Sequence, residues 1–261
     1  LAPLGGGAPP ASAQAVTATM GVGDLMRATA LDEVFTQFGA TVEASADQHA
    51  AAPLTSAMRS AWTASAREAF AAATMHADLA AALENRFTPT EFAAFEAFFG
   101  SPFGKRVTEI ERAVTILPPA RQLSIEGDGL ALAEAAAPRR HEQIEEMLGL
   151  ISADIALAMV RQSVRGVLIG MSMNGQQGDI QVPWEEIDAH IESIMPGIEE
   201  DVARTQRAVM FYAYEGLSEG ELDAYLDFLR TDPARKFYAL AAFSIGSIVA
   251  DRMERFGETL A

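Results

Sequence analysis

The chain has 261 residues, a length that fits one large domain or two modest ones. Hydrophobic residues make up 49% and charged residues 21%, which excludes disorder over the whole length. The formal net charge of −17 would repel a phosphate backbone, so nucleic acid is a poor candidate partner. Zero cysteines exclude disulfides, thiolate metal sites and a cysteine nucleophile.

The amino-terminal stretch 1–15 consists almost entirely of small or apolar residues and carries no charge. Small residues alternate within residues 11–15, as in the Ala-x-Ala pattern that signal peptidase cuts. We therefore expect this stretch to be the remnant of a signal peptide, with cleavage near Ala15, and the protein to be exported to the periplasm. A flexible or disordered tail is the alternative interpretation.

Beyond this tail, apolar positions recur at helical spacing and almost nowhere at strand spacing, which predicts an all-α chain. The expected helices cover residues 23–47, 53–86, 88–99, 102–117, 139–173, 183–195, 197–215, 218–229 and 233–256. The stretch 118–138, interrupted by Gly127-Asp128-Gly129, predicts a connector with short helical turns. The longest uncharged apolar stretch, 237–250, is shorter than the roughly 20 residues of a spanning helix, so we expect no transmembrane anchor.

Two of the expected helices repeat one pattern, because residues 88–99 align with 218–229 at an offset of 130 (218 minus 88). Each opens with a hydroxyl residue followed three positions later by glutamate, Glu91 or Glu221, which predicts a capping box. An apolar stripe at three- and four-residue spacing follows in both and is typical of a core-facing helix. We expect a helical bundle built from two related halves by internal duplication. The expected first repeat with its connector covers 16–137, and the second covers 138–261.

The alignment continues after a one-residue insertion, where Ser101–Lys105 meets Asp232–Lys236. Each segment reads as a cap, a proline at the first helical position and a lysine three residues later. The prolines are Pro102 and Pro233.

Lys105 and Lys236 are the only lysines among the 19 basic residues of the chain. A cation in the first turn of a helix is disfavoured by about 0.3–1 kcal/mol, so we expect each ammonium to lie close to an acid, in matching environments. Ion pairing is the structural interpretation, and anion binding or lysine chemistry is the functional one. The nearest candidate acids in the sequence are Glu91 and Glu96 for Lys105, and Glu221 and Asp227 for Lys236.

The capped helix with its glutamate, the aromatic stripe and the Ser-Pro-x-Gly-Lys segment resemble the bacterial family catalogued as domain of unknown function 2059. The resemblance covers residues 87–106, with a degenerate second copy at 217–237, where Arg235 stands in place of the expected glycine. The family motif falls on Glu91, Phe98, Ser101, Pro102, Gly104 and Lys105. The resemblance implies an exported helical protein and no particular activity.

Catalytic and metal-binding motifs are weak in this sequence. His141 with Glu145, and Glu186 with His190, are four residues apart, but solvated ion pairs explain this spacing better than metal ligation does. No phosphate loop, dinucleotide fingerprint or nucleophile elbow occurs. We therefore expect no enzyme, no cofactor and no metal.

Three functions from different classes remain. The leading one is a non-enzymatic, exported module that binds another protein or acts as a structural accessory. The alternative is a carrier of a small apolar or lipid-like ligand in a groove between the two halves. An enzyme that uses a lysine comes third; a closed, well-packed seam favours the first function and an open apolar pocket the second. The candidate binding residues are Glu91, Ser101, Pro102, Gly104, Lys105, Glu221, Pro233 and Lys236.

Overall fold

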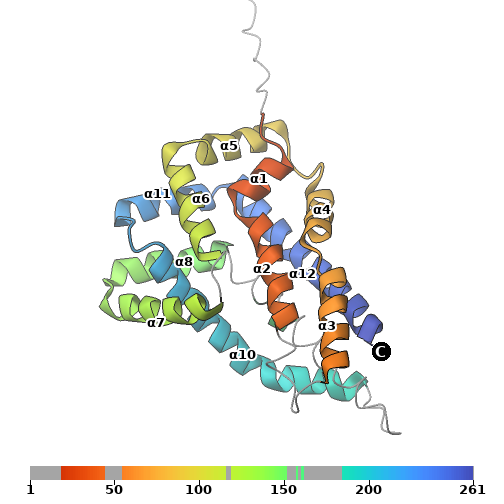
Figure 1. The fold of residues 1–261 in the computed structure, drawn as a ribbon. Coiled ribbons are helices and arrows are strands. Elements are labelled where there is room, and N and C mark those ends of the chain that lie inside the picture. Colours follow the sequence, from red (N-terminus) through yellow and green to blue (C-terminus); the bar gives the residue numbers. More distant parts are fainter. Residues whose placement is uncertain are drawn as a thin grey trace, which may run out of the picture.

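The computed structural model of the chain describes residues 19–44, 55–115, 119–151, 157, 160–161 and 184–260. Within these ranges all regular structure is α-helical, which confirms the predicted fold class (Figure 1). In the same ranges no helix is long and apolar enough to cross a membrane. The predicted signal remnant and its cleavage position lie outside the described residues.

The two long helices predicted up to residue 86 are each broken into two. The four helices are α1 (Val22–Ala28), α2 (Leu31–Ala44), α3 (Ser56–Ala69) and α4 (Ala72–Leu83). Ala30, between α1 and α2, has a left-handed φ of 54°, which no continuous helix accommodates. Buried residues such as Leu31 and Phe70 anchor both breaks in the core. Alanine-rich sequence hides these breaks, because helix propensity remains high across them.

The stretch predicted as a connector is instead a helix, α7 (Pro119–Ala135), which follows α5 (Pro89–Phe99) and α6 (Pro102–Thr115). Gly129 allows α7 to approach α10 (Trp184–Ala213) closely. A Cβ atom at Gly129 would lie 1.9 Å from the carbonyl oxygen of Ala208. The glycine is therefore a packing residue, and the connector prediction was wrong because glycine was interpreted only as a helix breaker.

The carboxyl-terminal helices are α8 (Pro138–Ile151), α10, α11 (Glu219–Leu229) and α12 (Asp232–Leu260). The predicted break before residue 197 is absent, because α10 continues through Pro196. A proline inside a helix removes one backbone hydrogen bond, and the long contact of α10 with α7 compensates for that loss. Most of the predicted helix beyond residue 151 lies outside the described residues.

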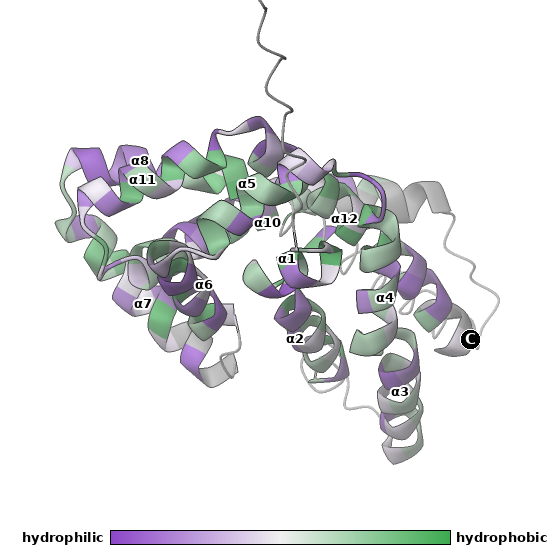
Figure 2. Ribbon diagram, turned by 90° about the horizontal axis from the view of Figure 1, so that it is seen from above, coloured by the Kyte–Doolittle hydropathy of each residue, from purple (hydrophilic) through white to green (hydrophobic). Residues whose placement is uncertain are grey.

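The arrangement is organised by the two long helices α10 and α12 (Figure 1). α10 packs against α6 and α7, whereas α12 packs against α3, α4 and α5. α2 covers α3 and α4, and α8 covers α11. Seen from above, α6, α7, α8 and α11 gather on one side of the molecule and α1 to α4 on the other, with α5 between them (Figure 2).

One hydrophobic core joins helices from both predicted repeats. Its fully buried side chains include Phe35 and Leu79 from the first repeat and Phe211 and Phe237 from the second. The predicted boundary at residue 137 falls between α7 and α8. Side chains from both predicted repeats are therefore packed into one common core within the described part of the chain.

Candidate functional site

The two aligned helix starts have the same cap geometry. Thr88 Oγ1 accepts the N–H of Glu91 at 3.2 Å, and the Glu91 carboxylate accepts the N–H of Thr88 at 2.7 Å. Ser218 and Glu221 form the same two bonds at 3.3 and 2.8 Å. Both predicted capping boxes are confirmed. A hydroxyl cap of this kind contributes about 1 kcal/mol, because it satisfies a backbone donor at the helix start.

The next helix in each copy also begins with a hydroxyl cap. Ser101 Oγ accepts the N–H of Gly104 at 2.9 Å and donates to the carbonyl oxygen three residues earlier at 2.6 Å. Thr231 Oγ1 accepts the N–H of Ala234 at 3.4 Å and donates to the carbonyl oxygen three residues earlier at 2.7 Å. We call residues 88–107 the first corner and residues 218–237 the second corner.

This cap geometry corrects the predicted alignment. The counterpart of Ser101 is Thr231, at the unbroken offset of 130 (231 minus 101), and the proposed one-residue insertion was wrong. The prolines misled the alignment, because Pro102 is the first residue of α6 whereas Pro233 is the second residue of α12. Lys236 is therefore the counterpart of Arg106, and the two lysines are not equivalent.

Gly104 sets the shape of the first corner. A Cβ atom there would lie 2.0 Å from the carbonyl oxygen of Phe98, so the start of α6 lies directly on the end of α5. The counterpart in the second corner, Ala234, is fully buried. Both positions require a small residue, which explains the glycine of the family motif by packing and not by ligand binding.

The capping glutamates also join the two corners to each other. Lys236 Nζ lies 2.8 Å from Glu91 Oε1, and Arg106 lies 2.6 Å from Glu221 Oε1. Each cap acid thus pairs with the cation at the equivalent position of the opposite corner. The predicted pairing of Lys236 with an acid is confirmed, but the candidate acids within its own corner were wrong. Among these, Asp227 instead pairs with Arg230 at 2.9 Å.

Electrostatics at the two caps follow from these contacts. The hydrogen bond from Lys236, followed by that from the Thr88 amide, lowers the pKa of Glu91 below its ordinary value. The pKa of Glu221 is also lowered, and here the Ser218 backbone has the larger effect and Arg106 the smaller one. Both carboxylates are therefore charged acceptors at neutral pH.

Two equivalent aromatic rings lie between the corners. Phe98 and Phe228 stack with ring centroids 3.8 Å apart and an interplanar angle of 4°. They are related by the same offset of 130 (228 minus 98). We call this ring pair, together with the Glu91–Lys236 and Glu221–Arg106 pairs, the seam. The stacked rings and the two ion pairs join the corners along the seam.

Lys105 does not take part in the seam. Its side chain is exposed and has no hydrogen bond or ion pair to any residue that the structure describes. The acids expected near it have other partners, Lys236 for Glu91 and Thr19 for Glu96. The prediction of an acid beside each lysine in matching environments was therefore wrong for Lys105. Its true counterpart is Arg235, whose side chain is likewise exposed and has no hydrogen bond or ion pair within the described ranges.

A buried polar cluster beside the seam escaped the sequence analysis. Glu111 Oε1 on α6 accepts the hydroxyls of Tyr214 at 2.7 Å and Tyr225 at 2.6 Å. Burial raises the pKa of Glu111, and the two hydroxyls partly oppose this shift. The buried hydroxyl of Tyr238 has no partner in the described part of the chain. The only signal in the sequence was that all four tyrosines fall within residues 212–238.

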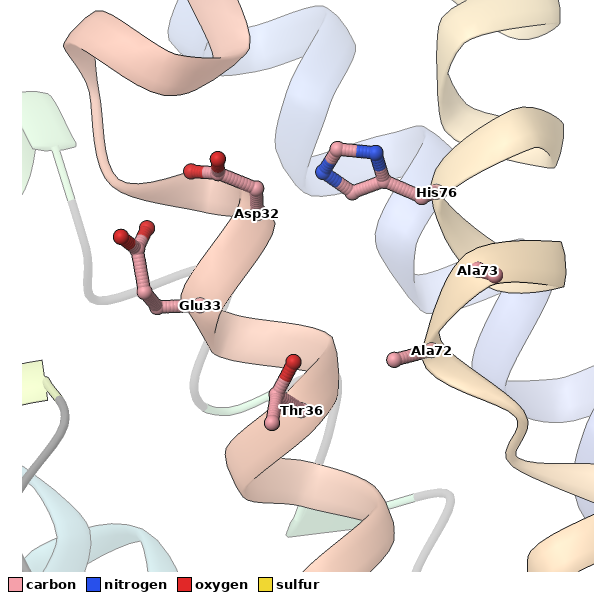
Figure 3. Close-up of a pocket in the computed structure, with 6 residues that line it drawn as sticks. All are labelled: Asp32, Glu33, Thr36, Ala72, Ala73 and His76. Carbon is pink, nitrogen blue, oxygen red and sulfur yellow. The ribbon is translucent and has the colours of Figure 1, made fainter.

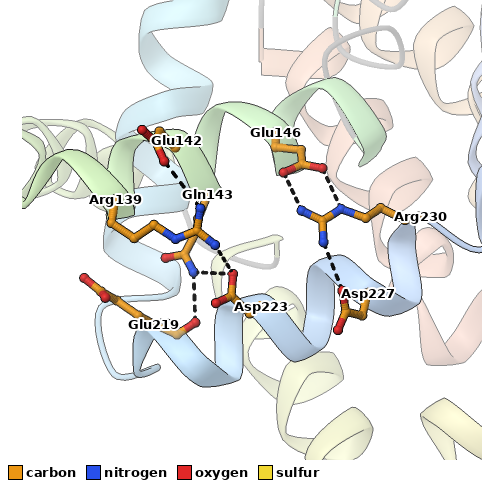
Figure 4. A network of polar contacts seen from close by, with 8 residues as sticks. All are labelled: Arg139, Glu142, Gln143, Glu146, Glu219, Asp223, Asp227 and Arg230. Atoms are coloured by element: carbon orange, nitrogen blue, oxygen red, sulfur yellow. Dashed lines mark hydrogen bonds and ion pairs between the residues drawn. The ribbon is translucent and has the colours of Figure 1, made fainter.

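A second network attaches α8 to α11 (Figure 4). Gln143, which is almost fully buried, donates to the carbonyl oxygen of Glu219 at 2.9 Å and to Asp223 Oδ1 at 2.8 Å. Arg230 binds both carboxylate oxygens of Glu146 at 2.7 Å. Such bidentate pairs fix orientation, so this network holds α8 on the outer face of the second corner.

The histidine and acid pairs considered as metal ligands form no metal site in the part of the chain that is described. Glu145 pairs with Arg207, and the ring of His141 packs edge-on against Phe211 at 4.9 Å. Within the described ranges no three His, Asp or Glu side chains are placed to hold a metal ion. The side chain of His190 lies outside the described residues.

A pocket of about 340 Å³ lies between α2 and α4, away from the seam (Figure 3). It is lined by Asp32, Glu33, Thr36, Ala72, Ala73 and His76. No sequence motif singled out these residues, because adjacent acids and a distant histidine are brought together only by the packing of α2 on α4.

The fold and the seam define an all-α protein with two equivalent capped corners. A family described as an uncharacterized protein conserved in bacteria (DUF2059) matches residues 73–116. The match extends from α4 to the end of α6 and includes the whole first corner, which confirms the resemblance seen in the motif. No curated protein and no solved structure matches the chain.

Replacing Glu111 with Gln should change how stability depends on pH. Because the pKa of Glu111 is raised in the folded state, the folded protein holds this proton more tightly than the unfolded chain does. The wild type should therefore lose stability relative to Glu111→Gln as pH rises above about 4.5, the ordinary value. Urea unfolding at pH 4.5 and pH 8 measures this difference. The exposed Glu109→Gln is the matched control, and a wild type that gains stability relative to Glu111→Gln as pH rises would contradict the assignment.

The two lysines should respond differently to the same substitution. Lys236→Met removes a half-exposed ion pair with Glu91 and a cation–π contact with Phe87, whose ring centroid is 5.2 Å away. This variant should lose about 0.5–1 kcal/mol of unfolding free energy. Lys105→Met removes no side-chain hydrogen bond or ion pair to a described residue and should leave stability unchanged. Equal losses in chemical denaturation would show that Lys105 has an internal partner.

Proposed function

We propose that the protein is an exported, non-enzymatic helical module that binds another protein through a surface that includes Lys105 and Arg235. The observation that carries this proposal is that both cations lie in the first turns of α6 and α12, exposed and without a partner among the described residues. The helix dipole disfavours a cation there by about 0.3–1 kcal/mol. An acidic group on a partner would compensate for that cost.

The non-enzymatic character is supported by how the motif residues are used. Ser101 caps a helix, Gly104 allows close packing, and Glu91 both caps α5 and pairs with Lys236. A catalytic group needs a polar atom that is free to meet a substrate. In the family motif of this chain, Lys105 is the charged group left free, but it is exposed, whereas a catalytic lysine needs a desolvated site.

The alternative of an apolar carrier has less support. A groove between the halves would lie along the seam, where Phe98 and Phe228 stack on each other. Ion pairs between the corners accompany this stack. A lipid-like ligand would have to displace these contacts.

We also propose that the two halves arose by internal duplication. The offset of 130 relates the caps, the stacked rings and the ion pairs of the two corners. It also relates α10 to residues 54–83 (184 and 213 minus 130), which contain α3 and α4. By the same offset α12 is the counterpart of α6, and α10 is the counterpart of α3 and α4. The packing is reciprocal, since α12 lies on α3 and α4 while α10 lies on α6 and α7. A duplicated unit in which each half packs its helices on the other half would produce this reciprocal packing.

Affinity capture of the tagged full-length protein from its native cell envelope tests the binding function. A partner should copurify with the wild type, and the double variant Lys105→Met and Arg235→Met should reduce its yield about tenfold, equivalent to about 1.4 kcal/mol of binding. The melting temperature should stay unchanged, because neither side chain has a hydrogen bond or ion pair to a described residue.

Arg121→Met is the matched control, since Arg121 is an exposed first-turn cation of α7 outside both corners. It should leave the partner yield intact. Retention of the partner by the double variant, or a loss that only follows the folded fraction, would contradict the proposed surface. Recovery of the protein solely from the cytoplasm would contradict export to the periplasm.

A further inference from the structure

The helix α12 exposes a phenylalanine on a side that carries no charge. Phe243 is 79% exposed, although it lies near the middle of the helix. Ala239 and Ser247, one turn to either side, are exposed as well, and Gly246 and Ala250 are half-buried. We call these five residues the Phe243 face. They lie within the stretch 237–250, which has no charged residue in a chain whose net charge is −17.

The spacing of this face is that of a helix which packs against another helix. Intervals of four, three and four residues separate Ala239, Phe243, Gly246 and Ala250. The contact positions of paired helices follow the same intervals. Ile245, on the opposite side of α12, is fully buried in the core. The helix therefore has one side in the core and a second contact side that the described part of the chain leaves largely exposed.

The other half of the molecule indicates that the fold of one chain does not cover this face. The counterpart of α12 is α6, and its residues Glu109 and Ala113 correspond to the first two residues of the Phe243 face (239 and 243 minus 130). α2 packs on α6, where Arg112 binds Glu33, yet Glu109 and Ala113 remain exposed. An isolated exposed aromatic residue needs no explanation, but a charge-free contact side on one helix alone points to an occupant outside the chain.

The charges at the two ends of the face favour a second copy of the chain in antiparallel orientation. Among the described side chains, the exposed charges sum to +1 at the amino-terminal end and to −1 at the carboxyl-terminal end. The first group is Asp232, Arg235 and Lys236, and the second is Asp251, Glu254 and Arg255. Arg235 and Glu254 have no hydrogen bond or ion pair from their side chains to a described residue. An antiparallel pair places unlike ends together, whereas a parallel pair places like ends together.

We propose that the Phe243 face binds a second copy of the chain and forms an antiparallel homodimer. A two-fold axis between Phe243 and Gly246 places each phenylalanine against the glycine of the other copy. The glycine has no side chain and leaves room for the ring. At the ends of the face, Arg235 of each copy faces Glu254 of the other. The dimer does not depend on the proposed binding of another protein, although the two surfaces share Arg235.

Sedimentation velocity of the purified full chain tests this dimer over concentrations from about 1 to about 500 μM. One pair of helices buries less area than a standard interface, so we expect a weak dimer with a Kd of about 10–100 μM. Phe243→Ser should raise the Kd about tenfold or more, and its melting temperature in dilute solution should stay unchanged, because the residue is 79% exposed. Glu254→Lys should raise the Kd about threefold or more, although it lowers the net negative charge, because like charges then face each other.

Met58→Ser is the matched control, because Met58 is also a large exposed hydrophobic residue and lies on α3, outside the Phe243 face. It should dimerise as the wild type does. Equal weakening by Met58→Ser and Phe243→Ser would indicate unspecific apolar association and would overturn the proposal. An unchanged Kd of Glu254→Lys would overturn the antiparallel arrangement. A chain that stays monomeric over the whole range would overturn the dimer, and a lower melting temperature of Phe243→Ser would then show that another part of the chain covers the face.

Discussion

The face-to-face contact between Phe98 and Phe228 is the constraint on which the rest of the seam depends. The two rings occupy equivalent positions of the two corners, and their stacking at 3.8 Å sets how closely α5 and α11 approach. At that separation each capping glutamate reaches a cation of the opposite corner. Glu91 and Glu221 therefore act twice, since each begins its own helix and also holds the other corner in place. Lys105 and Arg235 are then the exposed cations of the two corners whose side chains have no hydrogen bond or ion pair to a described residue.

The parts of the site that the sequence predicted depend on short-range contacts. Both capping boxes join residues three positions apart, so their chemistry can be recognised in a single window of sequence. The stripe that includes Phe95 and Tyr225 is likewise local, and both residues are fully buried. The all-α class and the motif of the first corner were predictable for the same reason.

The parts that could not be predicted depend on contacts between distant segments. The pairing of Lys236 with Glu91 joins residues 145 positions apart, and no local pattern distinguishes it from pairing within one corner. Gly129 was interpreted as a breaker because its neighbour on α10 is 79 positions away (208 minus 129). The pocket at Asp32 and His76 likewise exists only because α2 packs on α4. The prolines are a local signal, but they shifted the predicted alignment of the second corner by one residue.

A double-mutant cycle on the ring pair tests the central claim most directly. Phe98→Leu, Phe228→Leu and the double variant would be compared by chemical denaturation of the full chain. If the seam depends on the stacked rings, the two substitutions should be coupled by about 0.5–1.5 kcal/mol, because the first one already removes the contact that the second would lose. Losses that add to within about 0.3 kcal/mol would show that the rings act independently and would contradict this account of the seam.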